Sequence, residues 1–293
     1  MSSRILPPEL IDNIIDHFHD DPVNLHSCAL VNSAWLPASC YHIFRCVSIR
    51  IDKGTYPYNT SYSGDASRLY RIVLSSLEII PFICDLLIYK GTKSPDQDLN
   101  WMTQEESLPL LLHLLTNLWR LKFKIVDRLI EHKLVQWYTH LIDSICMASC
   151  LPSIIELKLC GLLFDTWEQL LQMFHLFPAL KVLHLEKILL VEEEEGKVDY
   201  IAYQYDEAEG GSDLVTTQHA CLDVLSIASH SPAIIKILLH PRSFIDVMCI
   251  CELNLVVQPV WLPNLLRSTP YLERLQFNFG YGESFLHLPC DIF

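Results

Sequence analysis

The sequence has 293 residues, of which 51 % are apolar, and its 35 acidic and 21 basic side chains give a formal net charge of −14. This composition excludes a disordered chain, because a disordered chain lacks the apolar surface that offsets the entropy lost on folding. The shortage of Lys and Arg argues against general nucleic-acid binding and against docking on anionic lipid, since both need basic side chains.

The sequence lacks the features of a membrane-spanning or secreted protein. It contains no apolar run of about 18 residues, so we expect no transmembrane helix, and its first residues lack the apolar core of a secretory signal. The 11 Cys residues are odd in number and lie in apolar runs, which is typical of reduced thiols. We therefore expect a cytoplasmic and/or nuclear protein that binds neither a membrane nor nucleic acid.

Residues 1–50 predict three short helices. Leu6-Pro7-Pro8-Glu9 is typical of a helix start, because Pro is tolerated in a first turn and Glu suits the helix dipole. Asp21 is a candidate N-cap for the second helix, and the third follows Trp35-Leu36-Pro37. A unit this short cannot hide so much apolar surface by itself. The surplus either packs on the rest of the chain or belongs to a partner.

Turn formers and polar residues in 51–66 predict a linker, and over 67–293 helical runs alternate with strands of the form apolar-x-apolar. We expect seven strand cores: Leu87-Ile88-Tyr89, Leu121-Lys122-Phe123, Leu157-Lys158-Leu159, Leu183-His184-Leu185, Leu225-Ser226-Ile227, Leu253-Asn254-Leu255 and Leu275-Gln276-Phe277. Recurring strand–helix units are typical of leucine-rich repeats, because one unit cannot bury its own apolar face whereas a stack can. The sequence predicts an α/β fold in which 67–293 form an irregular leucine-rich-repeat-like solenoid with a parallel sheet. An ordinary α/β domain is the alternative.

An acidic insertion at 191–214 separates two of these expected strands. Between Glu192 and Asp213 it holds nine acidic side chains and one basic side chain, Lys197. Like charges at this density repel each other, so we expect a mobile loop. A docking strip for a basic partner is the functional alternative.

Motifs of catalysis are missing from the sequence. It has no G-x-G-x-x-G, phosphate-binding loop or G-x-S-x-G elbow. The closest Cys pairs, Cys146-x₃-Cys150 and Cys249-x-Cys251, lack zinc-knuckle spacing, and we expect Cys249 and Cys251 to face the core together. We predict no catalytic residue, no metal site and no cofactor, so the protein is not expected to be an enzyme.

The N-terminal segment carries a family resemblance. Leu6-Pro7-x-Glu9-Leu10, an amphipathic helix after it, and Leu30-Val31-x-x-x-Trp35 resemble the F-box over residues 5 to about 46. The following Leu36-Pro37-x-Ser39-x-Tyr41-His42-x-Phe44 is similar to the form common in large fungal F-box families. Asn32-Ser33 departs from the family, which often has Cys followed by Lys or Arg there.

This resemblance implies a substrate receptor of a Skp–cullin–F-box ubiquitin ligase, a non-catalytic subunit. The implied partners are a Skp-type adaptor, through it a cullin, and a protein substrate held by the later repeats. The residues that the resemblance assigns to adaptor binding are Leu6, Pro7, Glu9, Leu10, Ile14, Leu30, Val31 and Trp35. A leucine-rich interaction scaffold that acts outside a ubiquitin ligase is the alternative.

The strand pattern also suggests a substrate surface. Where the two apolar residues of a strand core point inward, the middle residue points to the concave face of the sheet. That row would be Ile88, Lys122, Lys158, His184, Ser226, Asn254 and Gln276. A merely solvated sheet face is the alternative interpretation.

Overall fold

The computed structural model describes residues 6–50, 62–64, 66–90, 107–125, 151–164, 166–190, 220–228, 234, 238, 245–256, 262–278 and 285–289. The acidic insertion expected at 191–214 lies outside the described residues, as does the pair Cys146 and Cys150.

The three N-terminal helices that the sequence predicts are present. They are α1 (Pro8–Asp16), α2 (Pro22–Ala29) and α3 (Leu36–Arg45), and each has Pro in its first turn. Asp21 is the N-cap of α2, because its Oδ1 accepts hydrogen bonds of 3.1 Å from the backbone N–H groups of Val23 and Asn24. We call residues 6–45 the helical unit.

The helical unit has a small apolar core of its own. Its buried members come from all three helices: Ile11, Ile15, Leu25, Cys28 and Ile43. A contact of 2.8 Å between His42 Nε2 and Asp16 Oδ1 also joins α3 to α1. Phe44, at the end of α3, packs against both this core and the larger core of the sheet.

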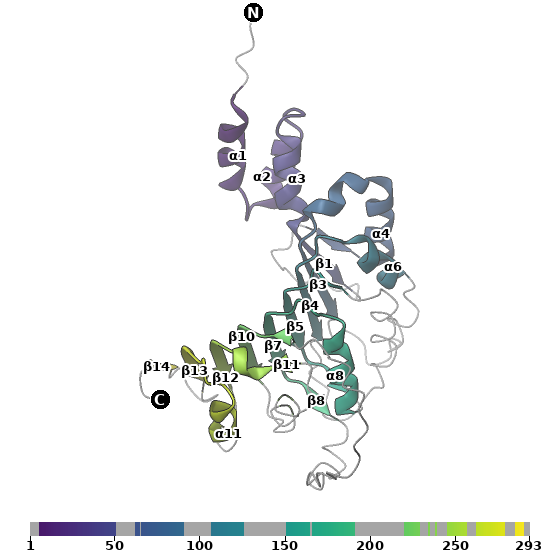
Figure 1. Cartoon of the computed structure of the whole chain (residues 1–293). Helices are drawn as coiled ribbons and strands as arrows, with labels where there is room; N and C mark the ends of the chain where they lie inside the picture. The colour runs from purple at the N-terminus through teal and green to yellow at the C-terminus, as the bar shows by residue number, and fades with distance from the viewer. Residues whose placement is uncertain are drawn as a thin grey trace, which may run out of the picture.

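One sheet of ten strands dominates the rest of the chain (Figure 1). Its strands are β1 (Cys46–Arg50), β2 (Tyr62–Gly64), β3 (Asp85–Lys90), β4 (Arg120–Ile125), β5 (Glu156–Cys160), β7 (Val182–Glu186), β10 (Val224–Ala228), β12 (Glu252–Leu255), β13 (Arg274–Asn278) and β14 (Phe285–Pro289). From β3 onward, strands that follow one another in this sheet are also neighbours in it, and all pairings are parallel except that of β13 with β14. All seven expected strand cores lie in these strands, and the prediction of an α/β fold with a large, mainly parallel sheet is confirmed.

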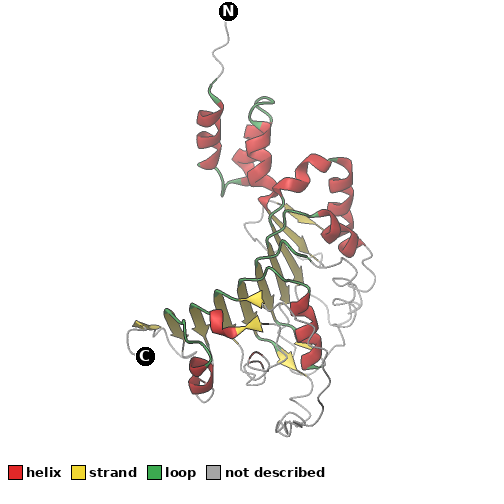
Figure 2. Cartoon of the chain, in the orientation of Figure 1, coloured by secondary structure: helices red, strands yellow, loops and turns green. Residues whose placement is uncertain are grey.

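Helices and short segments link the strands. They are α4 (Ala66–Ser75), η1 (Leu77–Phe82), α6 (Ser107–Leu114), β6 (Leu163–Phe164), α8 (Trp167–His175), β8 (Leu189–Leu190), β9 (Ala220–Cys221), β11 (Ile245–Asp246), η3 (Val247–Cys249) and α11 (Leu262–Arg267). Figure 2 shows α4, α6 and α8 on one side of the sheet, while none of the described helices covers the opposite side. Within the described ranges, we find no helix with the length and apolar character needed to cross a membrane.

Two rows of apolar side chains point from the sheet toward these helices. The register aligns Leu86, Leu121, Leu157, Leu183, Leu225, Leu253 and Leu275 in the first row and Ile88, Phe123, Leu159, Leu185, Ile227 and Leu255 in the second. All of them are buried. Because neighbouring members are paired in register and all are buried, these rows form a continuous core along the sheet. Burial of each Leu side chain contributes roughly 1.5–3 kcal/mol to stability.

The structure corrects two expectations about the strands. Ile88 does not belong to the polar row: it is 2 % exposed in the core, and Leu87 is the residue of β3 that lies beside Lys122. The residues from Leu86 to Tyr89 are all apolar, so their pattern did not fix which side faces inward. In addition, β1 lies within the segment 1–50 and β2 within the expected linker 51–66, and neither strand was predicted.

Candidate functional site

The helical unit exposes an unusual share of apolar side chains. Fourteen large apolar side chains are exposed in the part of the chain that the structure describes, and eight of them belong to residues 6–45. These eight are Leu6, Leu10, Ile14, Val23, Leu30, Val31, Leu36 and Tyr41. In Figure 1 the start of α1 and the connection from α2 to α3 lie at the same end of the helical unit, away from the sheet.

Helix α1 explains part of this exposure, because it carries two apolar stripes. Ile11 and Ile15, four residues apart, face the core of the unit and are buried. Leu10 and Ile14, one position earlier on the helix, form a second stripe that is 49 % and 36 % exposed. The first stripe packs α1 into the core of the unit, and the second stripe keeps enough exposed area to contact another surface.

The turn between α2 and α3 exposes a second apolar group. Leu30 is 86 % exposed and Val31 is 59 % exposed. Asn32, one of the two residues that depart from the F-box pattern, shapes this turn: its side-chain Oδ1 accepts a hydrogen bond of 2.8 Å from the backbone N–H of Ala34. Asn32 therefore has a local structural role in presenting the two apolar residues that precede it.

The structure separates the predicted adaptor residues into two groups. Leu6, Pro7, Glu9, Leu10, Ile14, Leu30 and Val31 are exposed, or at the limit of exposure in the case of Ile14. Trp35 is half-buried and packs against the core of the helical unit, so at least part of its ring serves the fold. We call Leu6, Leu10, Ile14, Leu30, Val31 and Leu36 the apolar surface; of these, Leu36 was missed as a candidate, although it follows Trp35 directly.

A second candidate surface lies on the side of the sheet away from the helices. The register places one residue from each of eight neighbouring strands, β1 to β13 in the order of the sheet, in a single row: Ser48, Leu87, Lys122, Lys158, His184, Ser226, Asn254 and Gln276. We call this row and its flanking polar residues the open face. Six of the seven residues predicted for it lie in the row, and Ile88 does not.

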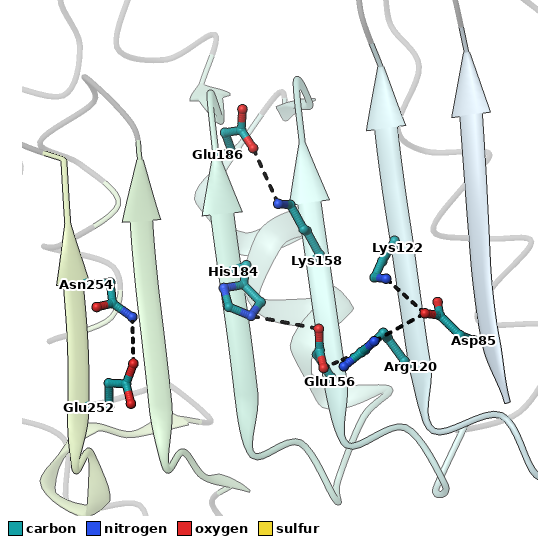
Figure 3. A network of polar contacts seen from close by, with 9 residues as sticks. All are labelled: Asp85, Arg120, Lys122, Glu156, Lys158, His184, Glu186, Glu252 and Asn254. Atoms are coloured by element: carbon teal, nitrogen blue, oxygen red, sulfur yellow. Dashed lines mark hydrogen bonds and ion pairs between the residues drawn. The ribbon is translucent and has the colours of Figure 1, made fainter. Parts of the chain in front are cut away.

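Ion pairs connect the strands across the open face (Figure 3). Asp85 Oδ2 lies 2.9 Å from Lys122 Nζ and 3.3 Å from an Arg120 guanidinium nitrogen. Arg120 Nε donates a 2.6 Å hydrogen bond to Glu156, whose other oxygen lies 3.9 Å from His184 Nε2. The charge of Lys122 is therefore already paired with a buried carboxylate, whereas Lys158 forms a looser pair of 3.6 Å with the more exposed Glu186.

The local environment shifts the pKa values of three side chains on this face. Burial alone would lower the pKa of Arg120, but its hydrogen bond with Glu156 and the attraction of Glu156 and Asp85 outweigh burial and raise it. Burial lowers the pKa of His184, the three neighbouring cations act in the same direction, and Glu156 opposes them. Burial, together with Glu186, raises the pKa of the Cys160 thiol to about 11.

Asp85, Arg120 and Glu156 were not candidates from the sequence. Their signal is the same period of two, since each stands two residues before the middle residue of its strand and so projects from the same side. The pairs Arg120-x-Lys122 and Glu156-x-Lys158 display that alternation of polar residues. Their contacts, by contrast, depend on which strands become neighbours.

Cys249 and Cys251 correct another expectation. They do not face the core together, because Cys249 lies in the short helix η3 and both residues are only half-buried. Cys249 instead lies near Cys221 and Asp246, with one donor atom of each residue within 4.8 Å of those of the others. The side-chain hydrogen bond that Cys249 makes with Cys221 contributes most to raising the pKa of Cys249 to about 12, and burial and Asp246 add to it.

Comparisons with models of protein families, with curated proteins and with solved structures find no match to this chain. The apolar surface and the open face themselves are therefore the features from which a function can be inferred.

Proposed function

We propose that this chain is the substrate-recognition subunit of a Skp–cullin–F-box ubiquitin ligase. In this proposal the helical unit is an F-box that docks on a Skp-type adaptor, and through the adaptor on a cullin. The strands and helices after it form a leucine-rich-repeat-like solenoid that holds a protein substrate. The observation that carries the proposal is the apolar surface, because it contains five of the eight residues that the F-box resemblance assigns to adaptor binding.

The apolar surface lies outside the core of the helical unit. Ile11, Ile15, Leu25, Cys28 and Ile43 already form a buried core there. Phe44 packs against both this core and the core of the sheet, and the Tyr41 ring contacts Phe82 edge-on with 6.4 Å between ring centroids. The members of the apolar surface lie outside the core of the helical unit, with exposed fractions from 36 % for Ile14 to 86 % for Leu30. A concentration of exposed apolar side chains is typical of a protein-binding site.

The solenoid part of the proposal is supported by strand order. Neighbours in the sheet follow one another along the chain from β3 to β13, all in parallel. A stack of this kind makes contacts between adjacent units and leaves one side of its sheet available for binding. The open face is that side, and we assign substrate binding to it.

Substrate contacts on the open face fall toward its second half. The ammonium group of Lys122 is already paired with Asp85. The polar groups of Lys158, His184 and Ser226 are more readily available to a substrate, and Asn254 and Gln276 continue the row. The subunit would then act as a scaffold with no chemistry of its own. It would raise the effective concentration of the substrate beside the ubiquitin-carrying enzyme.

Adaptor capture tests the proposal against a scaffold that acts outside a ligase. The full chain is mixed with a purified Skp-type adaptor and a cullin, and the co-purifying fractions are compared with those of two variants. Leu10→Asp places a charge in the apolar surface and should weaken adaptor binding at least about tenfold, since central interface residues cost about 2 kcal/mol or more when lost. Leu110→Asp is the matched control, because Leu110 of α6 is 52 % exposed and Leu10 is 49 % exposed.

The control should bind the adaptor like the parent chain, and both variants should unfold at the parent's temperature. Absence of adaptor and cullin from the parent's fractions would contradict the ligase proposal and favour the independent scaffold. Equal losses in both variants would show that the apolar surface is not the docking site.

A further inference from the structure

Three side chains of types that can ligate a metal meet outside both surfaces described so far. The strands β9 and β11 pair in parallel, so that Ala220 lies beside Ile245 and Cys221 beside Asp246. Ala220 and Ile245 are buried in the main core. Because side chains alternate along a strand, Cys221 and Asp246 point to the other side of this small sheet, next to each other.

The short helix η3 adds the third side chain. It begins directly after Asp246, whose Oδ1 accepts a 2.9 Å hydrogen bond from the backbone N–H of Met248. The other carboxylate oxygen of Asp246, Oδ2, accepts a hydrogen bond of 3.7 Å from Cys249 Sγ. The backbone contact thus fixes the carboxylate so that its second oxygen faces the two thiols, and donor atoms of all three residues lie within 4.8 Å of one another.

We propose that Cys221, Asp246 and Cys249 bind one thiophilic divalent cation, with Zn²⁺ as the fitting ion. Two thiolates and one carboxylate oxygen are ligand types that Zn²⁺ accepts in tetrahedral sites, and three protein ligands leave one position open for water or a partner's donor. Both thiols lose their protons when the ion binds. This site is independent of the proposed ligase role.

The donor set selects among metals. Thiolates are poor ligands for Mg²⁺ and Ca²⁺, which prefer oxygen, and a carboxylate is a poor ligand for Cu⁺, which prefers sulfur. The mixed set of two sulfurs and one oxygen therefore favours Zn²⁺. The orientation of Asp246 by the Met248 backbone is the kind of outer contact that supports metal ligands.

Co²⁺ is the probe for the test, because it replaces Zn²⁺ in tetrahedral sites and gives visible absorption when sulfur coordinates it. The reduced full chain is titrated with Co²⁺ and then with Zn²⁺. We expect one equivalent to produce sulfur-to-cobalt and tetrahedral absorption bands, and Zn²⁺ to remove them. Cys221→Ser and Cys249→Ser should abolish the bands, and Asp246→Asn should weaken Co²⁺ binding at least about tenfold.

Cys251→Ser is the matched control, since Cys251 lies two residues from Cys249 but outside the cluster; it should leave the titration unchanged. Unfolding temperatures measured without metal verify that each variant folds, and Zn²⁺ should raise that of the parent and of Cys251→Ser alone. Bands that survive in Cys221→Ser or Cys249→Ser, an equal loss in Cys251→Ser, or no absorption in the parent would overturn the proposal. A Cys221–Cys249 disulfide in a chain that takes up no Co²⁺ after reduction would overturn it too.

Discussion

The helical unit and the sheet use apolar residues in opposite ways. In the sheet, Leu157 lies between Leu121 and Leu183 in a row whose members are all buried. In the helical unit, Leu10 and Leu30 lie outside the core and are 49 % and 86 % exposed. The comparison teaches that a high Leu content does not by itself indicate a core, because position relative to neighbours decides whether a Leu stabilises the fold or remains available for binding.

On the open face, charged side chains are joined to one another: Asp85 contacts two cations, and Arg120 contacts two carboxylates. The open face therefore pairs much of its charge internally, whereas the apolar surface of the helical unit leaves its side chains exposed within the described residues. Four experiments on variants can break or sharpen this difference.

The largest effect is expected from truncation of the sheet core. Leu157→Ala should lower the free energy of unfolding by about 2–5 kcal/mol, because it removes buried contacts and leaves a cavity. Leu10→Ala, the matched change in the helical unit, should stay within about 0.5 kcal/mol. Urea unfolding of both variants measures the contrast, and equal losses would mean that the two regions do not differ as described.

A smaller loss of stability should follow from opening the ion-pair network. Asp85→Asn leaves Lys122 and Arg120 without their shared, buried carboxylate, which should lower the free energy of unfolding by about 1–3 kcal/mol. Glu186→Gln removes a single, more exposed pair with Lys158 and should cost less than about 1 kcal/mol. If Glu186→Gln lowers the free energy of unfolding more than Asp85→Asn in the same urea experiment, Asp85 is not the main stabilising carboxylate of the network.

The two lysines of the open face, Lys122 and Lys158, should differ in how their substitution affects substrate capture and stability. Lys158→Glu should weaken capture about fivefold while stability changes by less than about 1 kcal/mol, because its own ion pair is loose and exposed. Lys122→Glu should also reduce stability, since it sets a carboxylate against Asp85. Crosslinking of cellular substrates followed by mass spectrometry quantifies capture. Unchanged capture by Lys158→Glu, with adaptor binding intact, would remove the open face as the substrate site.

The smallest effect concerns acid stability. The pKa of His184 is lowered in the folded protein, so the unfolded chain binds the proton more readily. Its contribution to stability is present above the ordinary His pKa of about 6.5 and is lost as the pH falls below it. His184→Gln should therefore lose less stability than the parent between pH 7.5 and 5.5 in urea titrations. An equal or larger loss would contradict the assigned direction.

The alternation of apolar and polar residues predicted much of this fold, because most strands have a polar residue between two apolar ones. Lys122, Lys158 and His184 each stand between two core residues, so the sequence identified both the strand and the side that faces outward. The prediction failed at β3, where Leu87 occupies the polar row and Tyr89 is 4 % exposed although it also points away from the main core. With apolar residues on both sides, alternation carried no information.

Contacts between distant segments could not be predicted in the same way. Cys221 and Cys249 meet because β9 pairs with β11 and η3 turns back over them, and neither feature has a strong sequence signal. The ion pairs of Asp85 likewise require the order of strands. The apolar surface was accessible to prediction because it combines a local helical pattern with a unit too short to bury it.

Hydrogen exchange of the full chain, with and without a purified Skp-type adaptor, tests the central claim most directly. If the apolar surface docks on the adaptor, added adaptor should slow exchange in peptides from residues 6–36 and leave peptides from β5 to β7 unchanged. The result that would contradict the claim is unchanged exchange throughout residues 6–36 at saturating adaptor, or protection confined to the sheet.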